Sequence, residues 1–241
     1  MLLLWGLSIA TAQPVIHSSF SSDDGNPALD EDGTVNGTVI WRTGVVHVAS
    51  YYSIAPTTQF PNPVLIIRTG AIVKIADRFA IVGGVPQWAP TFNGYISAGT
   101  DNATLQIDGA TITDIRDDSA GGDTNGDGAN SSPSVWGNLR FSGSSRDYLK
   151  NSTIKYCKMG HIGSMDISGN AFLKFQGMYS SSDQNGNTDP TVLNASPRIH
   201  DNSFQFFSVP GNLDLRGMTP VVENNVFQDS AGFSFAVWTR I

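Results

Sequence analysis

The feature that most constrains the fold is a short repeated pattern near the end of the chain. Ser196–Gln205 (SPRIHDNSFQ) matches Thr219–Gln228 (TPVVENNVFQ) at a shift of 23 residues, which pairs Asn202 with Asn225. The same pattern, apolar-x-x-Asn-x-apolar, occurs at Ile167–Phe172, with looser copies at Ile107–Ile112 and Leu149–Ile154. A repeat of about 20 residues is one supersecondary unit that cannot bury its apolar face alone. Such units stack on one another.

The residues between the repeats favour β-structure. Apolar residues at helical spacing are almost absent, and Gly or Pro interrupts the stretches that could carry them. Short β-rich runs bounded by turn residues predict strands at Thr38–Trp41, Val45–Ala49, Val64–Arg68, Ala71–Ile75, Thr104–Ile107, Leu139–Phe141 and Ser234–Trp238.

Two solenoid types have repeats of this length, and the dense Leu spacing of leucine-rich repeats is missing. We therefore predict an all-β fold in which one chain winds into a right-handed parallel β-helix. Asn202 and Asn225 then occupy equivalent turns and form a ladder of amides between coils. The alternative is that these two residues lie in two similar hairpins.

The spacing between copies of the pattern is uneven, which a β-helix tolerates because insertions leave the coil as loops. The two longest gaps contain polar segments rich in Gly, Ser, Asn and Asp, at Asp117–Ser134 and Ser180–Ala195. We expect both segments to be exposed loops.

Three stretches carry a resemblance to a known group of proteins. They are Pro63–Ile75 (PVLIIRTGAIVKI), Ile115–Gly128 (IRDDSAGGDTNGDG) followed by 136–141 (WGNLRF), and Asn151–Cys157 (NSTIKYC). Together they resemble secreted bacterial right-handed β-helix proteins of the pectate-lyase-like type, which carry a DTNGDG insertion. The resemblance covers about residues 35–241. It implies the fold and export to the surface more than any activity, because many such proteins have no assigned chemistry.

The chain departs from the pattern of that group at two places. Asn138 stands where Gly is usual, and Ile81–Tyr95 (IVGGVPQWAPTFNGY) is unlike the common coil.

Composition and the ends of the chain set the expected organisation. The 241 residues include 14 basic and 21 acidic ones, for a net charge of -7, which argues against a nucleic-acid partner.

We predict a signal peptide at residues 1–12, ending on an A-x-A pattern but lacking a basic start. A buried first strand is the alternative. An acidic linker is expected at 13–37 and the β-helix at 38–241, incomplete at its C-terminus. No apolar run is long enough to span a membrane.

The segment Asp123–Gly128 (DTNGDG) has the spacing of a calcium-binding loop. Asp123, Asn125 and Asp127 supply oxygens at loop positions 1, 3 and 5, and Gly128 permits the sharp turn. Ser134 stands where an EF-hand has its bidentate Glu, so a helix-loop-helix is excluded. We predict a structural Ca²⁺ site, completed by Asp117 or Asp118. A solvated acidic turn is the alternative.

An enzymatic function needs carboxylates, or carboxylates with a base, on one face. The candidate catalytic residues are Asp117, Asp118 and Arg140. Further carboxylates and bases are Asp114, Asp166, Asp214, Lys155 and Lys158. None of them lies in a lyase or polygalacturonase signature.

Aromatic, His and Cys residues give weaker indications. Trp88 and Tyr95 lie in the atypical Pro- and Gly-rich stretch, where they could form an exposed ligand-binding platform. The wider aromatic set could form stacking platforms for sugars, but we expect each member singly to lie in the core or at the end of a coil: Trp41, Trp88, Trp136, Trp238, Tyr51, Tyr52 and Tyr95. We expect Cys157 to be a small buried apolar residue and the four His residues to lie at the surface or in turns.

The sequence thus favours a secreted or cell-surface β-helix scaffold without catalytic activity, acting in adhesion or carbohydrate binding. Its partner would be a polysaccharide or a cell-surface glycan. The alternative is a carbohydrate-active enzyme, either a calcium-assisted polysaccharide lyase or a glycoside hydrolase.

Overall fold

A computed structural model describes residues 14–17, 20, 37–76, 78–82, 85–89, 94–99, 102–126, 137–179, 195–206, 212–215, 217–228 and 234–236. Sheet A contains β1 (Val15–His17), β3 (Val46–Ser50), β6 (Ile72–Ala76), β11 (Thr111–Asp114), β14 (Thr153–Lys155), β17 (Ala171–Phe175), β20 (Ser203–Phe206) and β23 (Val226–Gln228). Sheet B contains β2 (Thr38–Trp41), β5 (Val64–Ile67), β10 (Thr104–Asp108), β13 (Tyr148–Lys150), β16 (Asp166–Ser168), β19 (Arg198–His200) and β22 (Val221–Glu223). Sheet C contains β4 (Tyr52–Ser53), β9 (Tyr95–Ser97), β12 (Gly137–Arg140), β15 (Cys157–Gly160), β18 (Gly177–Tyr179), β21 (Asn212–Asp214) and β24 (Ser234–Ala236).

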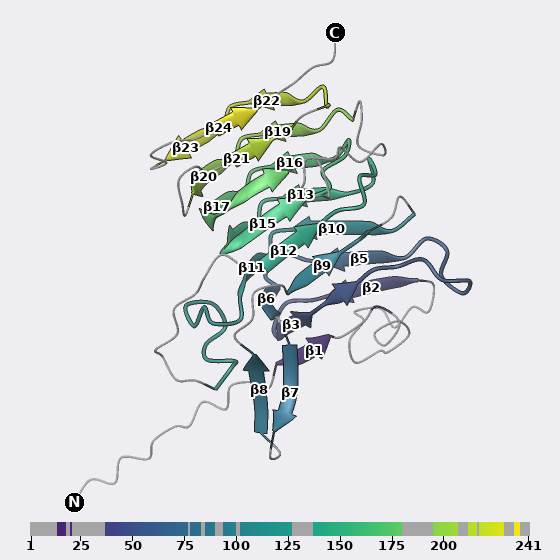
Figure 1. The fold of residues 1–241 in the computed structure, drawn as a ribbon, viewed down its shortest axis with the longest axis vertical. Helices are drawn as coiled ribbons and strands as arrows, with labels where there is room; N and C mark the ends of the chain where they lie inside the picture. Colours follow the sequence, from purple (N-terminus) through teal and green to yellow (C-terminus); the bar gives the residue numbers. More distant parts are fainter. Residues whose placement is uncertain are drawn as a thin grey trace, which may run out of the picture.

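The chain visits the sheets in the repeating order B, A, C, and each strand pairs in parallel with the equivalent strands of the neighbouring coils. Figure 1 shows the coils stacked from the N-terminal to the C-terminal end. The protein is a right-handed parallel β-helix, as the repeats predict. Among the described residues, no helix has the length and apolar composition needed to cross a membrane.

The core consists of inward-facing side chains stacked in columns, because every second residue of a strand points to the same face. Members of each column are register partners and are fully buried: Ile67, Ile107, Leu149, Ile167 and Ile199 in sheet B; Val73, Ile112, Ile154, Phe172 and Phe204 in sheet A; Leu139, Met159, Met178 and Leu213 in sheet C. The rings of Phe172 and Phe204 lie parallel at 4.5 Å. These columns stabilise the stack without a disulfide.

A polar ladder forms the turn between sheets B and A. The backbone N of Ser152 donates to Oδ1 of Asn170 at 2.9 Å, that of Asn170 to Asn202 at 3.0 Å, and that of Asn202 to Asn225 at 3.0 Å. The residue before each Asn is left-handed, with φ between 54° and 67° at Gly169, Asp201 and Asn224, a conformation that Gly, Asn and Asp adopt most easily. The predicted Asn ladder is confirmed.

Two insertions leave the coil at the same corner, between sheets A and C. One is an antiparallel hairpin of β7 (Arg78–Val82) and β8 (Val85–Ala89), between β6 and β9. The other insertion, in the next coil, connects β11 to β12. It contains the acidic segment, which the structure describes as far as Gly126. Figure 1 shows the hairpin projecting from the N-terminal part of the stack.

The β-helix begins earlier than the predicted boundary at residue 38. Strand β1 lies inside the range predicted to be a linker and pairs with β3, adding a first strand to sheet A. His17 is fully buried there, with Nε2 at 2.9 Å from Nδ1 of the buried His47 and its ring stacked on Trp41. The prediction that the His residues lie at the surface or in turns is therefore wrong for this pair. Residues 1–12, the predicted signal peptide, lie outside the described part of the chain.

Candidate functional site

The described acidic segment, residues 114–126, covers part of the outer face of sheet A, and we call it the acidic loop. Its Ile115 joins Val48 and Ala76 in a small apolar cluster. A Cβ at Gly121 would come within 2.7 Å of a methyl of Val46. The loop is therefore packed directly on the outward side of β3 and β6.

Lys74 lies beneath this loop, on β6 between Val48 and Thr113 of the neighbouring strands. Its side chain is fully buried, and Nζ donates to the backbone O of Gly122 at 2.5 Å. Burial lowers the pKa of Lys74, and the nearby charges of Asp118, Asp117, Asp123 and Asp114 oppose that shift. Lys74 is the cation around which the carboxylates of the loop gather.

Asp117 is held by donors from the protein itself. Its Oδ2 accepts from Oγ1 of Thr113 at 2.6 Å and lies 3.3 Å from Nζ of Lys155. Its Oδ1 accepts from N and Oγ of Ser119, at 3.1 and 2.5 Å. Burial tends to raise the pKa of Asp117, but the bonds from Ser119, Thr113 and Lys155 outweigh it and lower the pKa. Asp117 thus acts as a structural hydrogen-bond acceptor.

The remaining described carboxylates of the loop include two with local partners. Asp114 forms a two-point ion pair with Arg116, at 2.8 and 2.9 Å. Asp123 accepts from the backbone N of Gly126 at 2.7 Å, as in a turn. Asp127 lies outside the described residues, and within them no three His, Cys, Asp or Glu side chains converge as a metal-binding group. The Ca²⁺ site stays a prediction.

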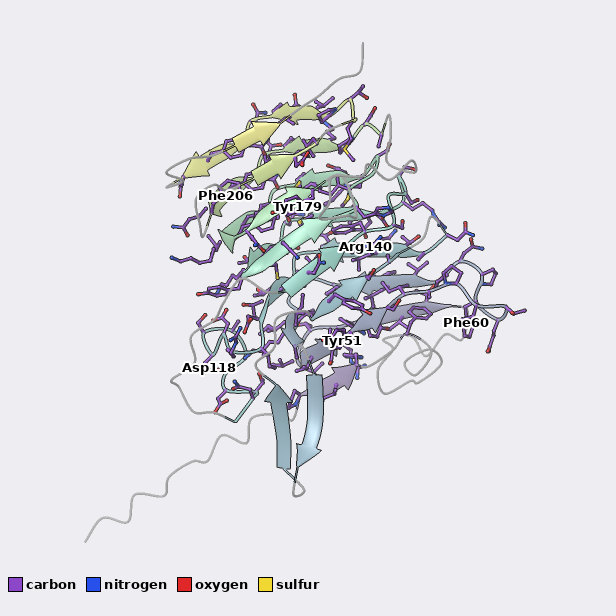
Figure 2. The ribbon with its side chains drawn as sticks, in the orientation of Figure 1. Tyr51, Phe60, Asp118, Arg140, Tyr179 and Phe206 are labelled. Carbon is purple, nitrogen blue, oxygen red and sulfur yellow. The ribbon has the colours of Figure 1, made fainter. Side chains whose placement is uncertain are left out.

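A second cluster of polar side chains lies on the outer face of sheet C. Leu139, Met159, Met178 and Leu213 point into the core, so the alternate residues of the same strands point outward. We call this surface the Arg140 face and define it by Ser97, Asn138, Arg140, Lys158, Gly160, Tyr179 and Asp214. Figure 2 shows Tyr51, Arg140 and Tyr179 one above another on the side that faces the viewer.

Arg140 and Lys158 are half-buried, and their side chains form no hydrogen bond or ion pair with the described residues. Nε of Arg140 and Oδ1 of Asn138 are buried atoms without a partner. Gly160 is the register partner of Arg140 in the next coil, and a Cβ placed there would meet nothing within 4 Å. The face therefore has an open position directly beside an unsatisfied guanidinium group.

Towards the C-terminal end, the same face carries Tyr179 and Asp214, which are register partners. Burial raises the pKa of Tyr179, and the charge of Asp214 adds to the shift. Both groups thus lie partly or fully shielded from water.

Tyr95, on β9, extends the polar surface towards the N-terminal end. Its ring lies edge-on to that of Tyr51, with centroids 5.3 Å apart. The sequence placed Tyr95 in an insertion together with Trp88, but Tyr95 belongs to a coil strand of sheet C. Trp88 lies on β8 of the hairpin, opposite Phe79, and its side chain is outside the described set.

The structure separates the three candidate catalytic residues. Asp117 and Asp118 belong to the acidic loop, whereas Arg140 lies on sheet C without a contact to either, and Figure 2 shows Asp118 and Arg140 on different parts of the molecule. Asp166 lies on sheet B, where it binds Lys150 at 2.9 Å and His200 at 3.1 Å. Cys157 is fully buried, which raises the pKa of its thiol, and the prediction of an apolar role for it is confirmed.

The sequence did not group the members of the Arg140 face. A usable signal was present, because Arg140 and Gly160 are 20 residues apart and Gly160 and Tyr179 are 19 apart. These intervals match the repeat length and place the residues on one face. No family model, curated protein or solved structure matches this chain.

Proposed function

We propose that this chain is a secreted, non-catalytic β-helix scaffold that binds carbohydrate through the Arg140 face. The observation that carries the proposal is that Arg140, Lys158 and Oδ1 of Asn138 on that face have no partner among the described residues. Half-buried hydrogen-bonding groups without partners are costly unless a ligand or water satisfies them.

The make-up of the face suits a sugar polymer. Neutral hydroxyl groups are bound by mixed donors and acceptors, which Ser97, Asn138 and Lys158 provide, while aromatic rings such as Tyr95 and Tyr179 pack against the apolar faces of sugar rings. Successive coils lie about 4.8 Å apart, so the face repeats in one direction. An extended chain molecule can contact several coils at once.

The described residues favour binding over hydrolysis. Glycoside hydrolases act with a pair of carboxyl groups flanking the bond that is cleaved. On the described Arg140 face, Asp214 is the one carboxylate. In the acidic loop, Asp117 is bound by Thr113, Ser119 and Lys155, and Asp114 by Arg116.

Binding to immobilised polysaccharides, measured by affinity electrophoresis, tests the proposal. We expect retardation by at least one polymer from a panel of neutral and acidic glycans, and we expect Tyr95→Ala to weaken it. Tyr148→Ala is the matched control, because Tyr148 is a half-buried tyrosine on the outer face of sheet B, beside Lys150.

Two results would contradict the proposal. One is the absence of retardation by every polymer of the panel. The other is an equal loss of binding in the Tyr95→Ala and Tyr148→Ala variants. Release of reducing ends or of unsaturated uronate products would support the enzymatic alternative instead.

A further inference from the structure

We propose that the open position beside Arg140 binds an oxyanion, a carboxylate or sulfate group carried by the glycan. This inference rests on the proposed function and adds the class of ligand to it. It assigns Arg140 as the main anion-binding residue and Lys158 as a second cation at the same position.

The first argument is the contrast between Arg140 and three other half-buried cations. Arg116 binds Asp114, Lys155 binds Asp117, and Lys150 binds Asp166, each within 3.3 Å. In an acidic protein with a net charge of -7, carboxylates outnumber the basic groups that they could pair with. Arg140 and Lys158 nevertheless carry no anionic partner. Their shared face therefore carries two neighbouring positive charges that are available to a ligand.

The second argument is the chemistry of the unsatisfied atom. Nε of Arg140 is buried and can only donate, because a guanidinium group has five N–H donors and no acceptor. Its planar fork matches the two oxygens of a carboxylate or sulfate, and such charge-assisted bonds are about twice as strong as neutral ones. A neutral hydroxyl would leave part of the fork without a partner.

The third argument is space. Gly160 lies directly opposite Arg140 in the next coil, and the position of its missing Cβ is empty to 4 Å. Lys158 precedes it by two residues on the same strand and points to the same side. Asp214 lies three coils from Arg140, about 14 Å along the stack, so it does not occupy the open position.

Pairs of polymers that differ only in charge provide the test. Calorimetric titration would compare polygalacturonate with its methyl ester, and a sulfated galactan with its desulfated form. We expect the charged member of at least one pair to bind about tenfold or more tightly, the range of a charge-assisted hydrogen bond. The pair that shows the difference identifies the oxyanion as carboxylate or sulfate.

Three variants locate the effect. Arg140→Gln removes the guanidinium group, and Gly160→Val places a side chain in the open position, where a Cβ meets no atom within 4 Å. Each should lose about tenfold in affinity for the charged polymer. Arg198→Gln is the matched control, because Arg198 is an exposed arginine on sheet B paired with Glu223, and it should bind like the parent protein.

The other outcomes overturn the oxyanion site. Equal affinity for charged and uncharged polymers, unchanged in Arg140→Gln but weakened in Tyr95→Ala, would refute the site and leave the proposed function standing. An equal loss in Arg140→Gln and Arg198→Gln would show attraction by overall charge rather than a site. Failure of all four polymers to bind, while a neutral glycan of the panel does bind, would also refute it. If no glycan binds at all, both proposals fail.

Discussion

The acidic loop and the Arg140 face contain the same kinds of charged side chain in opposite states. At the acidic loop, Lys74 from β6 donates to the Gly122 carbonyl. Lys155 from β14 and Arg116 of the loop each contact an aspartate. On the Arg140 face, Arg140 and Lys158 have no partner in the part of the chain that the structure describes. Both regions rest on the outer face of a parallel sheet, so the difference lies in the insertion and not in the coil.

The comparison separates charged side chains that stabilise the fold from charged side chains that are available to a ligand. Cations covered by an insertion become part of the structure, because a buried charge needs partners close by. Cations on a stretch of the same solenoid that no insertion covers can be satisfied by water or by a ligand. The partners of these cations can therefore be groups of a bound ligand.

The largest effect should come from removing the buried cation of the loop. Lys74→Met leaves the Gly122 carbonyl without its donor and four nearby aspartates without their central positive charge. We expect a loss of about 3 kcal/mol in the free energy of unfolding, because the buried aspartates beside Lys74 lose a nearby opposite charge. Urea denaturation measures it. Lys158→Met, on the Arg140 face, is the control and should change stability by less than about 0.5 kcal/mol.

The same variant tests the predicted Ca²⁺ site. Because Lys74 already supplies a cation and Asp117 is fully hydrogen-bonded, we expect millimolar Ca²⁺ to raise the melting temperature of Lys74→Met more than that of the parent protein. A large rise in the parent protein, lost in Asp123→Ala, would instead establish the calcium loop. It would also show that the loop is not satisfied by the side chains of the protein alone.

A smaller effect should follow acid titration of Asp117. Its pKa is lower when the protein is folded, so the carboxylate contributes stability above its unfolded pKa of about 3.9. That contribution disappears as the pH falls through the folded value. We expect Asp117→Asn to cost about 2 kcal/mol near neutral pH, and the difference from the parent protein to shrink below about pH 4. A difference that does not change with pH would contradict a charged Asp117.

The part of the fold that repeats was predictable from the sequence. The pattern around Asn202 and Asn225 predicted the coil, the turn and the amide ladder, because an αL residue followed by a stacked Asn has a strict chemical requirement. Outside the repeats the prediction was partial: the β-rich runs overlap β2, β3, β5, β6, β12 and β24, but they leave out strands such as β4 and β18. Strand Tyr52–Ser53 has a single inward residue, which is too short for an alternating pattern to be recognised.

The candidate sites were predicted residue by residue but not as groups. Arg140 was selected as a base and Tyr95 as part of a platform, yet their shared face depends on coil register across insertions of unequal length. Lys74 was missed altogether. It is a single Lys inside the apolar run Ile72–Ala76, and nothing in that run indicates that an insertion farther along the chain covers it. Contacts made by insertions are not periodic, and a repeat pattern cannot predict them.

The smallest effect should be seen when Arg140 itself is changed. Because Nε of Arg140 has no partner and its side chain pairs with no described residue, Arg140→Gln should alter the free energy of unfolding by less than about 0.5 kcal/mol. Arg116→Gln is the matched substitution in the acidic loop. It removes a two-point ion pair to a buried aspartate and should cost about 1–2 kcal/mol, as expected for a hydrogen bond to a charged group. Equal losses in the two variants would mean that Arg140 is already satisfied within the fold, and the distinction between structural and available cations would then fail.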